Sequence, residues 1–166
     1  TKPGPELRYE SPRILDELIY EILVAEGPIH RDVIIDRLRE LYDLGAIRGS
    51  TREKVEFEFD RMLHGKRAIA SGAFLYLNLD QLRFKAPRQP VDNRVDHFWP
   101  GELELLILNI AARYGGPEKG LVEQVTRMLG FTRTGRLITE TITRTIKNLL
   151  NTSRLKDSQG FIRPFD

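Results

Sequence analysis

Apolar residues recur at spacings of three and four along most of the chain, a pattern that predicts amphipathic helices. The first half contains three such stripes, and we expect Gly27-Pro28 and Gly45 to end the first two helices. Ser11-Pro12 is a typical helix start, because serine can accept a bond from a free N–H of the first turn. A period-two pattern over residues 67–79 then predicts a hairpin that turns at Ser71-Gly72.

The third helix of the first half has its own start signal. Ser50 and Glu53 have the spacing of a capping box, so we expect this helix to begin at Ser50. Its apolar face is formed by Val55, Phe59 and Met62 with Leu63. His30 is expected to start the second helix, and His64 to lie at the end of the third.

The second half repeats this plan. Three further helical stripes fall within residues 100–150, and a smaller hairpin follows over residues 154–163. Gly27-Pro28 matches Gly116-Pro117 and Gly45 matches Gly130, and the offsets of the matched pairs stay within 85 to 89 residues. Three helices followed by a hairpin are the outline of a winged helix-turn-helix. The sequence therefore predicts a mostly α fold of the α+β class, with two winged helix-turn-helix units in tandem.

The predicted boundaries follow from this repeat. Residues 1–10 are expected to form a tail, residues 11–80 the first winged-helix domain and residues 100–166 the second. Residues 81–99 are expected to form a connector without a helix, because prolines and scattered charges interrupt it. The chain opens with Thr1 rather than methionine, so we expect it to be a piece of a longer protein.

Composition narrows the class of protein. The chain has 166 residues and no cysteine, which removes disulfides, thiolate metal sites and cysteine nucleophiles. No apolar run reaches the ~20 residues that a membrane-spanning helix needs, so we expect no membrane partner and a cytoplasmic location. A bacterial origin is suggested only by the resemblance described below.

We find no pattern in the sequence that predicts catalysis. Phosphate-binding glycine loops, dinucleotide fingerprints and nucleophile elbows are absent. The three histidines fall in different predicted settings, so we expect no metal site, no cofactor and no enzymatic activity in this chain. The acidic residues are expected on exposed helix faces, including Glu102 and Glu104 as well as Glu53, Glu56 and Glu58.

Charge is distributed unevenly. Residues 1–80 hold 12 basic and 15 acidic residues, whereas residues 81–166 hold 14 and 9. The polar positions in and around the third helix of the second copy are largely basic, apart from Glu140 and Asp157, and they include Asn148. Basic side chains pair with phosphates, while threonine and asparagine can bond to phosphates or base edges. The predicted nucleic-acid contacts are Arg133, Arg136, Thr139, Thr143, Arg144, Lys147, Arg154 and Lys156.

The first copy favours a different partner. Its third helix has a net negative charge, which a phosphate backbone would repel. Phe57 falls outside the apolar stripe of that helix, and Tyr76, Phe98, Trp99 and Phe165 lie outside all the helical stripes. Aromatic residues are enriched in the cores of protein interfaces, although we prefer to place Phe98 and Trp99 in the seam between the two domains. The first copy is therefore expected to be a spacer or a protein-binding unit.

Three runs of residues resemble a known family. They are Glu26–His30, Arg94–Leu103 and Leu129–Gly135 with the later Ile138, Ile142 and Ile146. Together they resemble the domain of unknown function 3320 family over nearly the whole chain. The resemblance implies a module near the C-terminus of large bacterial proteins that combine a superfamily-one helicase-like ATPase with a restriction-endonuclease-like nuclease. The family has no assigned catalytic residues to transfer.

The sequence thus leads to two hypotheses. The first is a non-catalytic DNA-binding accessory module of a helicase/nuclease-like protein, which contacts the DNA backbone through the third helix and wing of the second copy. The second is a protein–protein interaction module that docks domains or subunits of the parent protein.

Overall fold

The computed structural model describes residues 6–83 and 94–165. The chain forms two compact units, Thr1–Arg83 and Phe84–Asp166. The predicted features at residues 1–5 and at Pro87, Pro90 and Val91 of the connector lie outside the described residues. Most of the described residues lie in helices, and the sheets are small and antiparallel. The predicted fold class, mostly α within the α+β class, is therefore confirmed.

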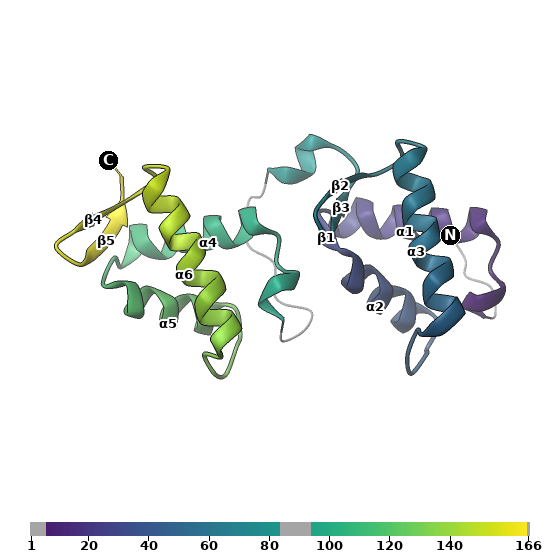
Figure 1. The fold of residues 1–166 in the computed structure, drawn as a ribbon, viewed down its shortest axis with the longest axis horizontal. Helices are drawn as coiled ribbons and strands as arrows, with labels where there is room; N and C mark the ends of the chain where they lie inside the picture. The colour runs from purple at the N-terminus through teal and green to yellow at the C-terminus, as the bar shows by residue number, and fades with distance from the viewer. Residues whose placement is uncertain (1–5, 84–93, 166) are drawn as a thin grey trace. The chain divides into compact units, whose positions relative to one another are not determined.

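The first unit begins with a short 3-10 helix, η1 (Leu7–Tyr9), and continues through α1 (Pro12–Glu26), β1 (Ile29–His30), α2 (Arg31–Leu41) and α3 (Gly49–His64). Strands β2 (Ile69–Ser71) and β3 (Phe74–Tyr76) and the 3-10 helix η2 (Leu79–Leu82) complete it. The strands form one antiparallel sheet in the order β1-β3-β2. The strand between the first two helices is thus joined to the hairpin that follows the third (Figure 1).

The second unit has the same order of elements. It contains the 3-10 helix η3 (Val95–His97), then α4 (Pro100–Arg113), α5 (Glu118–Met128), α6 (Arg136–Asn151), β4 (Leu155–Ser158) and β5 (Phe161–Pro164). Strands β4 and β5 pair as a hairpin. In place of a β1-like strand, Gly116 forms a single antiparallel bridge to Ile162, with N–H···O distances of 3.1 and 2.8 Å.

The two units match at one constant offset of 87 residues from β1 onward. Helices α2 and α5, α3 and α6, and the bridges Ile29–Leu75 and Gly116–Ile162 all agree with it. Some backbone residues with positive φ coincide as well: Asp43 (49°) corresponds to Gly130 (79°) after the second helix of each unit. The structural repeat is therefore stricter than the sequence pairs indicated.

Several predicted local features are confirmed. The Ser11 side chain accepts a bond from the Ile14 N–H at 3.3 Å, and Pro12 occupies the first turn of α1. Helix α1 ends before Gly27, as expected. His30 starts α2, because its Nδ1 accepts a bond from the Asp32 N–H at 3.1 Å. His64 is the last residue of α3.

Other local predictions were wrong. Helix α2 ends at Leu41 rather than at Gly45, because the chain turns at Asp43 in the left-handed region, and Gly130 therefore matches Asp43. Helix α3 begins at Gly49 after Arg48, without a side-chain cap, so the Ser50–Glu53 capping box does not form. The hairpin of the first unit turns at Gly72 and Ala73, one residue later than expected.

Each unit has a separate apolar core. The first core joins α1, α2 and α3 through large side chains such as Ile34 and Phe59, and it includes Leu7 of η1. The second core joins α4, α5 and α6 through residues such as Ile107 and Ile146, and Val95 and Phe98 of the predicted connector belong to it. Each core cluster contains residues of one unit only. Different side chains therefore pack against α3 and against α6.

Candidate nucleic-acid interface on α6

One face of α6 is fixed by the second core. Ile142, Ile146 and Leu149 are completely buried, and Ile138 packs against the same cluster. Figure 1 shows α6 crossing α4 and α5, which cover this apolar side. Because a helix repeats every 3.6 residues, the opposite face of α6 is directed away from the core.

The outward face of α6 gathers polar side chains at spacings of three and four. Together they line a shallow depression in the surface of the second unit. Its lining residues are Glu140, Thr143, Arg144, Lys147, Asn148 and Asn151. Three of these belong to the predicted site, namely Thr143, Arg144 and Lys147. Asn151 was missed, although its spacing of seven from Arg144 and four from Lys147 is the signal that could have found it.

The basic side chains of this surface differ in whether they form ion pairs within the protein. Among the described residues, Arg144 and Lys147 form no ion pair or hydrogen bond through their charged groups, and both are exposed. Arg136 is paired with Glu140, with 3.3 Å between Nε and Oε1. The two unpaired cations therefore form the centre of the charged surface, and Glu140 is the carboxylate of this depression.

The predicted cations of the hairpin are engaged within the unit. Arg154 Nη1 donates to Glu104 Oε2 at 2.7 Å. The ammonium group of Lys156 lies 5.6 Å from the centre of the Phe165 ring. Asp157 turns inward on its own hairpin, where Oδ1 accepts a bond from the Gly160 N–H at 2.7 Å. Both hairpin cations would have to exchange or share these contacts to reach a phosphate.

The remaining predicted residues lie at the beginning and edge of α6. Arg133 is exposed in the loop that precedes the helix, and Thr139 is exposed on its first turns. Thr143 is half-buried at the border of the depression. The structure thus brings Thr143, Arg144 and Lys147 together and leaves Arg133 and Thr139 at its margin.

The corresponding face of α3 has another character. At the offset of 87 residues, Phe57 and Asp60 of α3 correspond to Arg144 and Lys147 of α6. The Phe57 side chain is 69% exposed, and Glu53 and Asp60 are exposed beside it. Glu53 corresponds to Glu140, so both helices have a glutamate at this position, whereas the two basic residues of α6 are replaced in α3.

The basic residues of the first unit are largely neutralised. Arg52 pairs with Asp32 at 2.6 Å, Arg61 with Glu58 at 2.6 Å and Arg67 with Asp16 at 2.9 Å. The Lys54 ammonium donates to the carbonyl oxygens of Arg8 and Glu10 instead of facing a ligand. These contacts engage the cationic groups of all four residues within the first unit, and the expectation that this unit does not attract phosphate stays a prediction.

Two predicted surface carboxylates prove to be buried. Glu58 and Glu102 are each only 2% exposed, because they share a helix side with the core residues Met62 and Leu106, four positions further on. The sequence prediction followed their charge and not their helical position. Tyr76 and Phe98 are also buried, whereas Phe57 and Phe165 are exposed as their place outside the stripes suggested.

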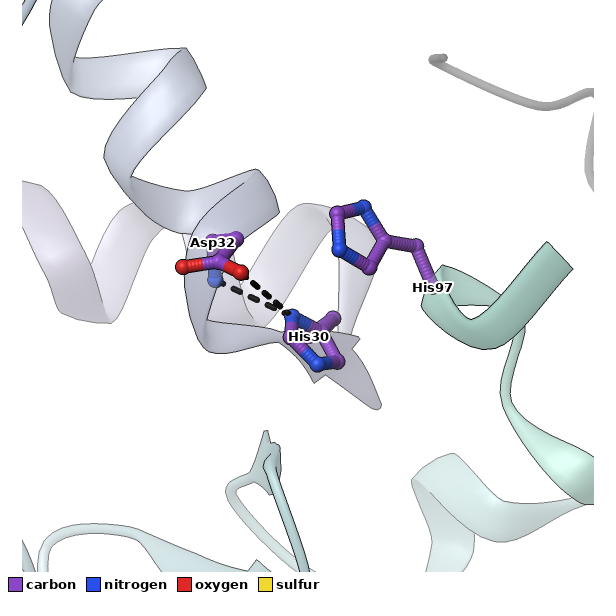
Figure 2. Close-up of side chains that lie close together, drawn as sticks. All are labelled: His30, Asp32 and His97. Atoms are coloured by element: carbon purple, nitrogen blue, oxygen red, sulfur yellow. Dashed lines mark hydrogen bonds and ion pairs between the residues drawn. The ribbon is translucent and has the colours of Figure 1, made fainter. Parts of the chain in front are cut away.

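Figure 2 shows His30 at the end of β1 with Asp32 in the first turn of α2. The His30 Nδ1 also lies 3.9 Å from Asp32 Oδ2. This geometry explains His30 as a local helix cap within the first unit. His97, which is drawn in the same view, belongs to the second unit.

Comparison with known proteins identifies similarity in one segment. Residues 7–44 match the model of a family described as Protein of unknown function (DUF3320). The match begins at η1 and extends just past α2, well under half of the chain, so this segment is similar to that family. No curated protein and no solved structure matches the chain. Among the described residues, no helix is both long and apolar enough to cross a membrane.

Proposed function

We propose that each unit is a winged helix and that the chain is a non-catalytic DNA-binding module. Support comes from the order of elements, with α3 and α6 as third helices followed by hairpins, and from the strand order β1-β3-β2. In helix-turn-helix proteins the corresponding helix lies in the major groove. In this proposal α6 is that helix and the β4–β5 hairpin is the wing.

The observation that carries the proposal is that two basic residues on α6 form no ion pair among the described residues. Arg144 and Lys147 stand one turn apart beside Asn148 and Asn151 on a face that no described acid neutralises except Glu140. Cations that form no internal ion pair can release counterions from DNA without first breaking a protein contact. The neighbouring amides can bond to phosphates or base edges.

The context of this module is also a proposal. Residues 7–44 are similar to the DUF3320 family, and the larger parent protein is implied only by the family resemblance of the sequence. By the resemblance described above, that parent is a cytoplasmic bacterial helicase/nuclease-like enzyme. The motor and nuclease chemistry would then lie in other domains, and the present chain would position the DNA for them.

The test is a binding titration with a matched control. Fluorescence anisotropy with labelled duplex, forked and single-stranded DNA across a salt series would compare the intact chain with Arg144→Glu/Lys147→Glu. Loss of two phosphate contacts should weaken binding at least about 50-fold at ~0.1 M salt and lower the log–log salt slope by about 2. The control, Arg113→Glu/Arg127→Glu, makes the same charge change on α4 and α5. Equal weakening by both pairs, or no weakening by the α6 pair, contradicts the site.

The alternative function is a protein-docking module. It is favoured by the exposed Phe57 ring on α3, since aromatic residues are enriched in the cores of protein interfaces. Circular dichroism would confirm that every variant remains folded. If the intact chain binds no DNA even at ~50 mM salt, where phosphate attraction is strong, this alternative becomes the leading function.

A further inference from the structure

The outward face of α3 combines an apolar ring with negative charge. Phe57 stands at its centre, with Glu53 one turn before and Asp60 one turn after. The ring is 69% exposed, although helix-borne aromatics are usually buried. Glu53 forms no ion pair among the described residues, and Asp60 forms only a long ion pair, with 3.9 Å between Oδ1 and the Arg31 Nη2. An occupant of this face must therefore present cations and an apolar side chain together.

The outward face of α6 has those complementary properties. Arg144 and Lys147 have no acidic partner among the described residues, and Glu140, the acid on the same face, is paired with Arg136. Leu137, two turns before Arg144, is half-exposed. Guanidinium groups stack favourably on aromatic rings, and ammonium groups pair with carboxylates. The two helices thus display, at corresponding positions of one repeat, an acidic aromatic face and a basic aliphatic face.

We infer that the α3 face of one copy of this chain binds the α6 face of a second copy. Such a contact would cover Phe57 with the Arg144 side chain and set Glu53 and Asp60 against the cations of α6. The contact joins two different surfaces, so repeated contacts of this kind build either closed rings or open chains of copies. The inference names the occupant for the docking alternative and does not depend on DNA binding.

One consequence of the shared face rests on the proposed DNA-binding function. A second copy on α6 and a phosphate backbone would compete for Arg144 and Lys147, so assembly and DNA binding would exclude each other. Added duplex DNA should then shift assemblies toward DNA-bound single copies. This competition would let local concentration control the exposure of the α6 face.

Sedimentation velocity of the intact chain at ~50 mM salt tests the inference directly. The average sedimentation coefficient should rise with protein concentration and fall again as salt screens the charges. Phe57→Ala should weaken self-association about tenfold, since buried aromatic anchors dominate interfaces. Asp60→Lys should weaken it about threefold or more.

A charge exchange separates a specific contact from a folding defect. Lys147→Asp should weaken association like Asp60→Lys, and the two changes in one chain should restore part of what each one loses. The control is Asp80→Lys on η2, which makes the same charge change away from α3 and should have no effect. A chain that stays monomeric at every concentration overturns the inference, as does self-association that is insensitive to Phe57→Ala and Asp60→Lys. None of these measurements uses DNA, so their failure is distinct from failure of the proposed function.

Discussion

Helices α3 and α6 occupy corresponding positions in the two units, yet their outward faces carry side chains of opposite charge. Both contain 16 residues, and every position of one corresponds to a position of the other 87 residues away. The inward residues correspond in type, with Phe59 matching Ile146 and Met62 matching Leu149, all nearly or fully buried. The outward pair changes from Phe57 and Asp60 to Arg144 and Lys147.

This difference shows that core packing constrains the inward face of each helix but not its outward face. The inward side must fill a core, so large apolar residues are retained at the matched core positions Phe59/Ile146 and Met62/Leu149. The outward side contributes little to folding, so its chemistry can diverge without cost to the helix. Divergence at these two positions is therefore more informative about partners than any feature that the two units share.

The largest expected effect tests whether the two scaffolds are independent. Phe59→Ala should destabilise the first unit, and Ile146→Ala the second, by about 3–5 and 2–5 kcal/mol respectively, because both side chains are completely buried. Urea unfolding followed by circular dichroism would measure the change. We expect Phe59→Ala to leave DNA binding through α6 intact, whereas loss of that binding would show that the units depend on each other.

The next effect exchanges the two faces. Arg144→Phe/Lys147→Asp transfers the α3 pair to α6 and should lower DNA affinity about 50-fold at ~0.1 M salt. Adding Phe57→Arg/Asp60→Lys to that chain places the cations on α3 and should recover part of the affinity. Anisotropy titrations of both chains provide the measurement. An exchanged chain that recovers nothing would show that the surroundings of α6, and not the pair itself, determine binding.

A smaller effect concerns Tyr42, which corresponds to Leu129 in the second unit. Its hydroxyl donates to Glu10 Oε1 at 2.7 Å, and burial together with Glu10 raises the pKa of Tyr42 above its ordinary value. Tyr42→Phe should destabilise the first unit by about 1–3 kcal/mol.

The raised pKa of Tyr42 also predicts a pH dependence. The unfolded chain releases the phenolic proton at about pH 10, before the folded chain does. The stability from this group is present below that pH and is lost as pH rises above it. Urea midpoints at neutral and alkaline pH would measure the loss, which Tyr42→Phe should remove. An alkaline loss that persists in Tyr42→Phe would assign it to another group.

The smallest effect concerns the acid that both helices share. Glu140→Gln removes the carboxylate beside Arg144 and frees Arg136 from its ion pair. DNA affinity should rise by no more than about fivefold, because exposed charge pairs contribute little. Glu53→Gln, at the corresponding position of α3, should leave DNA affinity unchanged. An equal gain in both variants would show that only net charge matters.

Helix periodicity and capping chemistry predicted much of the local structure correctly. Ser11-Pro12 and Gly27 are correct limits for α1, since their preferences act through the nearest backbone groups. The capping box at Ser50 was wrong because Gly49, at a φ of 52°, starts α3 earlier. The prediction that α2 ends at Gly45 was wrong for a related reason, since Asp43 already takes the left-handed conformation that ends this helix.

The candidate site was only partly predictable. Arg144 and Lys147 were predicted from charge and helical position, but their lack of internal partners depends on which acids the fold brings near. Arg154 is one of the predicted cations as well, and its partner Glu104 lies 50 residues away along the chain. Buried Glu58 and Glu102 likewise show that charge alone does not place a residue at the surface.

Apolar periodicity and turn residues act over a few neighbouring positions, so they were enough to predict the helices, the hairpins and the repeat. The constant offset of 87 residues and the bridge from Gly116 to Ile162 could be read only from the folded chain. The same holds for the difference between Arg154, which is paired with Glu104, and the unpaired Arg144 and Lys147. These features depend on groups that lie far apart along the chain. Strand pairing, burial and ion pairing join groups that are far apart in sequence, so they exist only once the core has brought those groups together.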